Sequence, residues 1–347
     1  METSLRFSAL FLYFILVVFN SMVAEGKVIR IDTHAHFVPP FYYDLFVSNG
    51  LKSSTRKWCA ADHLEFMDSM NIQLSILSIS TPGARLTPVD VMRGRKLARQ
   101  LNEYGHMVFM AYPERFRFFA TLLLPDVERS IEEAIYALDT LNAVGVALMA
   151  SSHSEYLGSK QFDPLMEVLN DRKATVFVHP SHLDASLVTH EIGGEKVEPY
   201  MIDFLLDTTR AAANLAIANV TGRYPNIKFI LAHSGGFLPF AAYRTSLLME
   251  AFMDANSEKI LAEYKKFYVD TAVSSSLSAL PSTLQFIPND QITFGTDYPY
   301  APTPEIRRFS MAFDEYPELG DELRRHINFD SAHRLFREHL SHWSPLV

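Results

Sequence analysis

Short apolar runs alternate with amphipathic stretches about eight times along the chain. The apolar runs have the length of buried strands, and the stretches between them repeat apolar residues at helical spacing. The predicted strands are residues 28–31, 72–80, 116–123, 144–149, 175–178, 227–231, 267–270 and 292–294. The predicted helices are residues 62–70, 88–112, 127–141, 162–172, 201–220, a helix running through 253, 276–286, and C-terminal helices between 304 and 339.

This alternation is typical of a parallel sheet whose strands are joined by helices. Eight repeats predict an α/β fold of the (β/α)₈ type, a TIM barrel. An open doubly wound sheet is the alternative, but no Gly-x-Gly-x-x-Gly sequence follows the first strand, which counts against a dinucleotide-binding fold. Residues 25–347 show no convincing linker and are expected to form one domain.

Two segments interrupt the pattern. Residues 39–61 are predicted to form a long loop, although Phe41, Tyr42, Tyr43 and Trp58 make it unusually aromatic for a solvated connection. Residues 181–199 form a second long insertion, which follows the fifth strand.

The composition is that of a globular protein with a large core, because 48% of the 347 residues are hydrophobic and 20% are charged. A formal net charge of -9 argues against nucleic acid as a partner.

Residues 1–24 have the pattern of a signal peptide. Arg6 precedes an apolar run over residues 10–19, and Ala24 offers a small residue for cleavage. The alternative is an uncleaved signal anchor, which would make a membrane a partner of the domain. Both interpretations place the domain in the secretory pathway, and a cytoplasmic location is the alternative to both.

Polar residues of similar chemistry stand at the ends of several predicted strands. His34 and His36 follow the first strand, His179 the fifth, His233 the sixth and Asp297 the eighth. His34 and His36 are two residues apart, so in an extended backbone both side chains project from the same face. Taken singly each residue is ambiguous: His179 could be a hydrogen-bonded core histidine, and Asp297 could cap a helix. Together, at the carboxyl rim of a barrel, imidazoles and a carboxylate suit a divalent ion such as zinc.

These residues also carry a family resemblance. Asp-Thr-His-Ala-His at 32–36, Phe-Val-His-Pro at 177–180, Ala-His-Ser-Gly-Gly at 232–236 and Gly-Thr-Asp-Tyr-Pro at 295–299 together resemble the amidohydrolase superfamily. The most similar branch is that of aminocarboxymuconate-semialdehyde decarboxylase and the aromatic-acid decarboxylases, which residues 156–158 and 162–165 also resemble. The resemblance runs from about Ile29 to Phe336.

The resemblance implies that His34, His36, His179 and Asp297 bind one divalent metal, with zinc favoured by ligand type and manganese as the alternative. It implies that His233 handles a proton beside that metal, and that the protein is a homodimer. Many superfamily hydrolases bridge two metals with a modified lysine at the end of the fourth strand. Residues 144–152 contain no lysine or carboxylate, which favours a single metal.

The resulting hypothesis is a carbon–carbon lyase that decarboxylates a small ortho-hydroxy aromatic acid without oxidation, with 6-methylsalicylate as the first candidate. Asp297 or His233 would protonate the ring carbon that loses the carboxylate. Two hypotheses remain open beside it: a metal-dependent hydrolase of a lactone or amide, and a non-catalytic binding protein that kept the fold.

Two further residues are candidates for substrate binding. By the resemblance, Arg244 would bind a carboxylate, with an ordinary surface ion pair as the alternative. Trp58 could supply a flat wall for an aromatic ring, although aromatic residues are more often part of the core. His153 is interpreted as a polar loop residue rather than a substrate contact.

Overall fold

The computed structural model describes residues 28–49, 57–86, 91–153, 155–181, 191–192 and 195–345. The predicted leader at residues 1–24 lies outside this part of the chain, as does most of the insertion after His179. Within the described residues, no helix is both long enough and apolar enough to cross a membrane.

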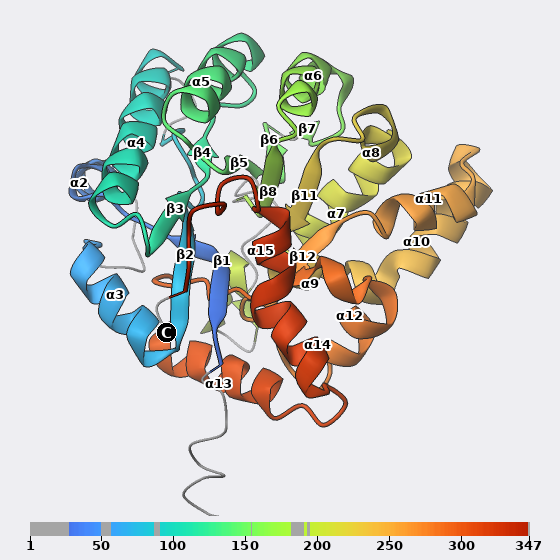
Figure 1. Cartoon of the computed structure of the whole chain (residues 1–347). Coiled ribbons are helices and arrows are strands. Elements are labelled where there is room, and N and C mark those ends of the chain that lie inside the picture. Colours follow the sequence, from blue (N-terminus) through green and yellow to red (C-terminus); the bar gives the residue numbers. More distant parts are fainter. Residues whose placement is uncertain are drawn as a thin grey trace, which may run out of the picture.

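Parallel strands form the centre of the molecule (Figure 1). They are β1 (Arg30–His36), β2 (Ile72–Ser78), β3 (Phe116–Phe118), β4 (Ala120–Thr121), β5 (Gly145–Met149), β8 (Thr175–His179), β11 (Lys228–Leu231), β12 (Tyr268–Asp270) and β13 (Ile292–Thr293). One run of neighbours is β1-β2-β3 and the other is β4-β5-β8-β11-β12-β13. Because β3 and β4 are separated only by Phe119, they occupy one position in the sheet.

Backbone hydrogen bonds join the two runs of strands at both ends. The Phe119 N–H donates to the Leu77 carbonyl at 2.8 Å, which continues the β2–β3 ladder towards β4. On the other side, the Thr33 N–H donates to the Phe294 carbonyl at 2.9 Å, which joins β1 to the residue after β13. Strand positions one to eight therefore form a ring, and the predicted (β/α)₈ barrel is confirmed.

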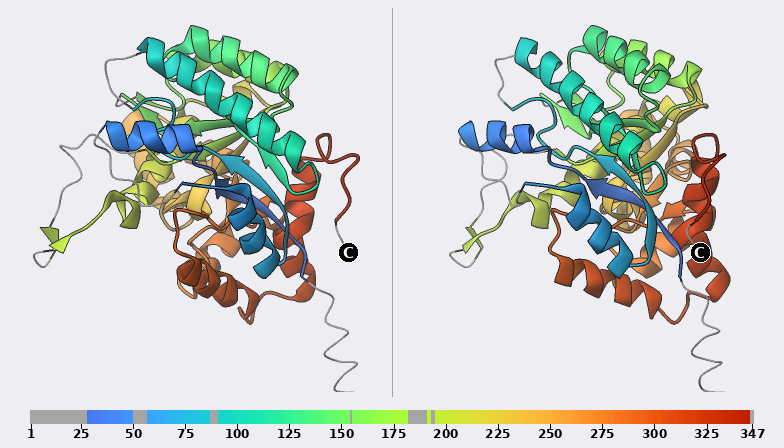
Figure 2. Two further views of the ribbon diagram at one scale, coloured as in Figure 1. Left: turned by 90° about the vertical axis from the view of Figure 1, so that its left-hand side faces the viewer. Right: turned by 60° about the vertical axis from the view of Figure 1, so that its left-hand side comes forward.

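Helices surround the strands on the outside, as the two views of Figure 2 show. They are α2 (Pro40–Ser48), α3 (Ala60–Ser69), α4 (Val91–Ala111), α5 (Val127–Asp139), α6 (Asp163–Asp171), α7 (Asp203–Ile217), α8 (Val220–Arg223), α9 (Ala232–Gly235), α10 (Leu238–Met253), α11 (Ser257–Tyr264), α12 (Leu280–Phe286), α13 (Thr303–Asp314), α14 (Asp321–Arg325) and α15 (Ser331–Leu335). Single turns are η1 (Lys160–Phe162), η3 (Pro199–Met201), η4 (Asn289–Gln291) and η5 (His326–Asp330). Two short antiparallel pairs, β6 (Ser151–Ser152) with β7 (Glu155–Tyr156) and β9 (Glu191–Ile192) with β10 (Glu195–Lys196), lie outside the barrel.

The inside of the barrel is filled by its own apolar cluster. Strand residues such as Ile31, Leu74 and Phe177 pack there and are fully buried. The C-terminal segment joins the same cluster through Phe336 and Trp343, and the Trp343 indole N–H donates to the Glu114 carbonyl at 2.8 Å. Burying such a side chain contributes roughly 1.5–3 kcal/mol. This cluster fills the barrel beneath the His34 ring, whose centroid lies 4.9 Å from that of Phe177.

The structure corrects two expectations about the N-terminal segments. The first strand continues to His36, because Ala35 and His36 pair with Leu77 and Ser78 of β2, so both histidines lie within the strand. The segment 39–61, predicted as a loop, contains α2. Proline is tolerated in the first turn of a helix, where its missing N–H is not needed. The same segment is anchored by buried Tyr42, whose hydroxyl donates to the Gly83 carbonyl at 2.8 Å.

Candidate metal centre and active site

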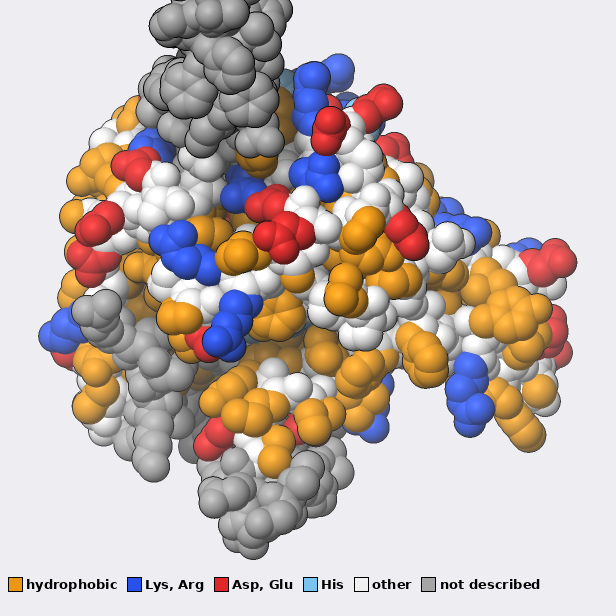
Figure 3. Space-filling view, turned by 90° about the horizontal axis from the view of Figure 1, so that it is seen from below, with side chains coloured by type: hydrophobic (Ala, Val, Ile, Leu, Met, Phe, Trp, Pro, Cys, Tyr) orange, Lys and Arg blue, Asp and Glu red, His pale blue; other side chains and the backbone are white. Residues whose placement is uncertain are grey.

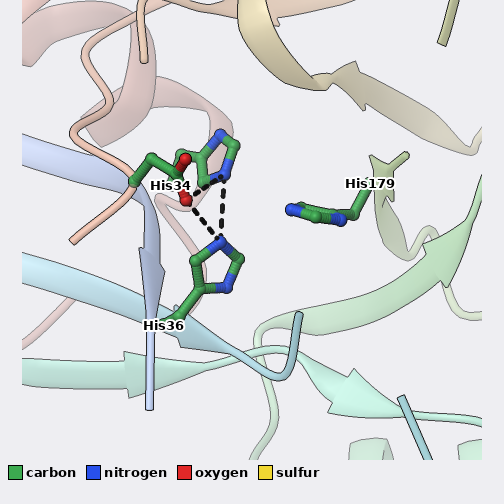
Figure 4. Close-up of side chains that lie close together, drawn as sticks. His34, His36 and His179 are labelled. Carbon is green, nitrogen blue, oxygen red and sulfur yellow. Dashed lines mark hydrogen bonds and ion pairs between the residues drawn. The ribbon is translucent and has the colours of Figure 1, made fainter. Parts of the chain in front are cut away.

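Four of the predicted residues meet at one end of the barrel. Figure 4 shows His34, His36 and His179 pointing towards one another. The Nε2 atoms of His34 and His36 are 3.1 Å apart, and the Asp297 Oδ1 atom lies 3.1 Å from the Nε2 atom of His36. One ligand atom from each of the four residues lies within 4.8 Å of the others. The predicted ligand set is therefore brought together as one group.

The backbone explains how residues so far apart in sequence converge. His34 and His36 project from the same face of β1, and His179 is the last residue of β8. Asp297 follows β13 in a left-handed conformation, with φ at 64°. Its N–H donates to the His34 carbonyl at 2.7 Å, so the end of β1 holds the turn that carries Asp297.

The outer nitrogen of each ligand histidine has a partner, which leaves the inner nitrogen available. The Nδ1 atom of His34 donates to Asp270 at 2.9 Å, and that of His179 donates to the Pro180 carbonyl at 2.7 Å. The Nδ1 atom of His36 lies 2.9 Å from the Ser78 hydroxyl, which itself donates to a carbonyl. Partners of this kind fix the tautomer and orientation of metal-binding histidines. The three Nε2 atoms and one carboxylate oxygen thus fit a divalent cation.

Charge and burial affect the ligands differently. Burial lowers the pKa of His36, and burial together with the neighbouring imidazoles lowers that of His179 well below its usual value. Burial acts in the same direction on His34, but the carboxylates of Asp270 and Asp297 raise its pKa to about 10. Burial opposes ionisation of Asp297, yet His34 and His36 hold the pKa of its carboxyl well below its usual range.

His233 stands beside this centre. Its ring centroid lies 4.8 Å from that of His34 and 6.2 Å from that of His179. Its Nδ1 atom donates to the Ala272 carbonyl at 3.1 Å. Burial and the nearby His34 lower the pKa of His233, so its ring is neutral and its Nε2 atom is able to accept a proton. This placement agrees with a proton-handling group.

Three residues with contacts to the centre were not assigned a role from the sequence. Asp270 receives the His34 hydrogen bond, and Asp32 accepts from Thr296 Oγ1 at 2.6 Å and from the His34 N–H at 3.0 Å. Burial raises the pKa of Asp32 to about 7. The Tyr300 ring lies 5.2 Å from that of His36. Asp32 is the third residue of β1, and Asp270 is the last residue of β12. Nothing in the local sequence distinguishes either aspartate from the aspartates that are common in turns.

A cavity of about 170 Å³ opens beside His179. Ser181 lines it, as does Thr81, whose neighbour Ser80 has its hydroxyl 3.5 Å from the Nε2 atom of His179. Arg85 also lines this cavity and brings a positive charge to the carboxyl ends of β2, β4, β5 and β8.

The two predicted substrate contacts lie in different surroundings. Arg244 is exposed on α10 and forms no ion pair within the described residues, so the alternative of an ordinary surface ion pair finds no support. Trp58 is buried in an aromatic cluster with Phe37 and Tyr104. Its indole N–H donates to the Nδ1 atom of His63 at 2.9 Å. His153, an exposed residue, lines the cavity beside His179.

Comparisons with known proteins agree with this geometry. Residues 31–337 match the amidohydrolase family. The chain is 36% identical to the decarboxylase yanB of Aspergillus niger, over 88% of this chain and 87% of that protein. It is 33% identical to a 6-methylsalicylic acid decarboxylase of Penicillium expansum, over 88% and 96% of the two chains.

The fold is also similar to that of a dihydroxybenzoic acid decarboxylase of Polaromonas, solved with bound manganese and 2-nitroresorcinol. The TM-score is 0.72 at 22% identity, with 90% of this chain and 99% of that chain covered. The predicted resemblance to the aromatic-acid decarboxylase branch is confirmed, and the relatives support the predicted carboxy-lyase class. The match over nearly the whole barrel shows that the chain belongs to the amidohydrolase family, and the convergence of the four predicted ligand residues agrees with it.

Proposed function

We propose that this protein decarboxylates a small ortho-hydroxy aromatic acid without oxidation, with 6-methylsalicylate as the first substrate to test. The observation that carries the proposal is the group of His34, His36, His179 and Asp297 with neutral, buried His233 directly beside it. The relatives named 6-methylsalicylic acid decarboxylase support this substrate class.

The reaction exchanges a carboxylate for a proton at one ring carbon. The bound cation would hold the substrate carboxylate and neighbouring hydroxyl in place and withdraw charge from them. His233 or Asp297 delivers the proton to the ring carbon, and the electrons of the breaking carbon–carbon bond return to the ring as carbon dioxide leaves. Because the resting His233 ring is neutral, its Nε2 atom takes this proton from solvent before delivering it, so one proton is consumed for each carbon dioxide released.

Zinc is the proposed metal, because three imidazoles and one carboxylate are ligands that zinc accepts readily. Manganese is the alternative, supported by its presence in the Polaromonas enzyme and in a 5-carboxyvanillate decarboxylase. Elemental analysis of protein purified without added metal tests the choice. About one zinc per chain is the expected result. Manganese at the same ratio would instead identify manganese as the metal.

Arg244 and Trp58 remain proposed substrate-binding residues. Arg244 carries a charge with no partner in the described structure, which leaves it available for a carboxylate. Trp58 lies next to Phe37, the residue after His36, so its ring cluster backs the strand that supplies two ligands.

A homodimer is the proposed assembly. Several large apolar side chains are exposed on α10, and Figure 3 shows hydrophobic side chains gathered at the projecting end of the molecule where Figure 1 places α10 and α11. They include Phe240, Tyr243 and Phe252, which are 85%, 67% and 81% exposed. An apolar face of this kind supports association with a second copy. Light scattering of purified protein should give twice the mass of one chain, and the mass of a monomer would refute the proposal.

We further propose that residues 1–24 direct the protein into the secretory pathway. The expected mature protein begins at Glu25, because cleavage is predicted after Ala24. N-terminal sequencing of protein from a eukaryotic host tests this. Full-length chain in membranes would support an anchor, and full-length chain in the cytosol would refute secretion.

The reaction itself is tested with a panel of hydroxybenzoates and purified, metal-loaded protein. Carbon dioxide release from ortho-hydroxy acids, and none from their meta isomers, is the expected pattern, because only the ortho hydroxyl can share the cation with the carboxylate. Ring opening of a lactone without carbon dioxide release would favour a hydrolase.

A further inference from the structure

A second buried carboxylate lies directly behind the metal ligands. Asp270 is the last residue of β12 and is fully buried. Its Oδ2 atom accepts the His34 Nδ1–H at 2.9 Å. Its Oδ1 atom accepts the backbone N–H of His233 at 3.1 Å and that of Ala272 at 2.9 Å. One side chain thus contacts both a metal ligand and the proton-handling residue.

We propose that Asp270 is a positioning residue for both histidines, holding His34 ready to bind the cation and His233 ready to reach the substrate. The proposal rests on the proposed function only in the roles given to these two histidines. Its first consequence concerns metal affinity, which is measurable without any substrate.

The contact to His34 decides which ring nitrogen faces the cation. A carboxylate accepts hydrogen bonds and cannot donate one, so Asp270 requires a proton on the Nδ1 atom of His34. The proton that a cation displaces is then the one on the Nε2 atom, which faces His36 and Asp297. The Nδ1 atoms of His36 and His179 lie against a hydroxyl and a carbonyl, so within the described residues His34 alone of the three bonds to a carboxylate through Nδ1.

The contact to His233 holds an unfavourable backbone. His233 and Ser234 both have left-handed conformations, with φ at 55° and 58°, which residues with a Cβ atom rarely adopt. Asp270 binds this turn twice, because its side chain accepts the His233 N–H and its backbone carbonyl accepts the Ser234 hydroxyl at 3.4 Å. The Ala272 carbonyl, two residues later, accepts the Nδ1–H of His233. The end of β12 therefore sets both the position and the tautomer of His233.

The packing around Asp270 is tight. A Cβ atom added at Gly295 would lie 2.9 Å from the His34 Cβ atom and 3.2 Å from that of Asp270. Glycine at this position therefore lets β1, β12 and the turn before Asp297 approach closely enough for the His34–Asp270 contact.

The first test is Asp270→Asn in the full chain. The amide oxygen can still accept the two backbone N–H groups, which leaves the NH₂ group facing the His34 Nδ1 atom. That arrangement favours a proton on Nε2, where the cation must bind. We expect the dissociation constant for zinc, measured by competition with a chromogenic chelator, to rise about 10–100-fold. An unchanged dissociation constant would overturn the proposal.

Asp32→Asn is the matched control, because Asp32 is equally buried and also accepts hydrogen bonds near His34 without touching an imidazole nitrogen. The zinc affinity of Asp32→Asn should stay within about threefold of the wild type, because Asp270 and not Asp32 sets the tautomer of His34. Equal losses in both variants would mean that burial of a carboxylate alone matters, and would overturn the positioning role.

Asp270→Ala separates the two contacts. At saturating metal it should lower kcat more than Asp270→Asn does, because only alanine also releases the His233 backbone, while KM changes little. Equal kcat values for the two variants at saturating metal would overturn the His233 part. Failure of decarboxylation altogether, with the zinc losses as expected, would count against the proposed reaction and leave the His34 part standing.

A measurement on the wild type keeps the proposal testable if the variants do not fold. In zinc-loaded protein, the His34 Nδ1–H bonded to Asp270 should give a protected, low-field proton signal coupled to histidine nitrogen. A His34 ring with no proton on Nδ1 would refute the proposal directly.

Discussion

Replacing His233 with asparagine gives the sharpest test of its role, because asparagine tolerates the left-handed backbone that this position requires. His233 has φ and ψ both at 55°. Asparagine adopts this conformation more readily than other residues with a Cβ atom. The variant therefore removes the imidazole while preserving the turn, whereas alanine should cost roughly 1 kcal/mol more in folding free energy.

The expected loss follows from the position of the imidazole. His233 is buried and 4.8 Å from the His34 ring, so water cannot easily take its place in carrying a proton to the substrate. A positioned acid–base group contributes about 10²–10⁴-fold in rate. At 1.36 kcal/mol per factor of ten, this corresponds to about 2.7–5.4 kcal/mol of activation free energy. The loss should fall on kcat, with KM and metal content unchanged.

The assay is steady-state release of carbon dioxide from 6-methylsalicylate by metal-saturated enzyme, with thermal unfolding measured on the same samples. Lys173→Asn is a matched control, since Lys173 also has a positive φ, at 51°, but is an exposed residue before β8, at the end of that strand opposite His179. It should keep kcat within about twofold. A His233→Asn variant with wild-type kcat, or one that loses its metal, would refute the proton-handling role.

Three shorter predictions concern the ligands and the substrate. His34→Ala should lose most of its metal by elemental analysis together with nearly all turnover; full metal content would contradict the ligand assignment. Binding of zinc at pH 8 should release about one proton per chain, because the pKa of His34 is raised to about 10 while His36 and His179 are already neutral. Calorimetry in buffers of different ionisation enthalpy measures this, and release of no proton would contradict it. Arg244→Ala should raise KM more than it lowers kcat, and an unchanged KM would exclude a carboxylate contact.

The barrel and the convergence of the candidate ligands were predictable because both follow from simple periodicities. Strand lengths and helical spacing located each strand to within a few residues, and parallel strands place their carboxyl ends together. His34, His179, His233 and Asp297 stand at such ends, so the topology alone brings them to one rim. The predicted end of β1 differed because its pairing with β2 and with Tyr298 extends the strand through His36.

Asp270 and α2 escaped prediction for different physical reasons. Asp270 is the last residue of a strand. Only its contacts with His34 and His233, which are distant in sequence, distinguish it from a turn residue. The helix α2 begins at a Pro-Pro pair, which equally marks a loop, and its one fully buried side chain, Tyr42, gives no helical periodicity. Contacts between distant segments decided both cases.

The fate of the solvent proton tests the proposed reaction most directly. Metal-loaded enzyme should convert 6-methylsalicylate in deuterium oxide to a product with one deuterium at the carbon that held the carboxylate, with release of carbon dioxide. Mass spectrometry and NMR of the product identify that position. A product that keeps its carboxylate and gains the elements of water would contradict decarboxylation and identify the barrel as that of a hydrolase.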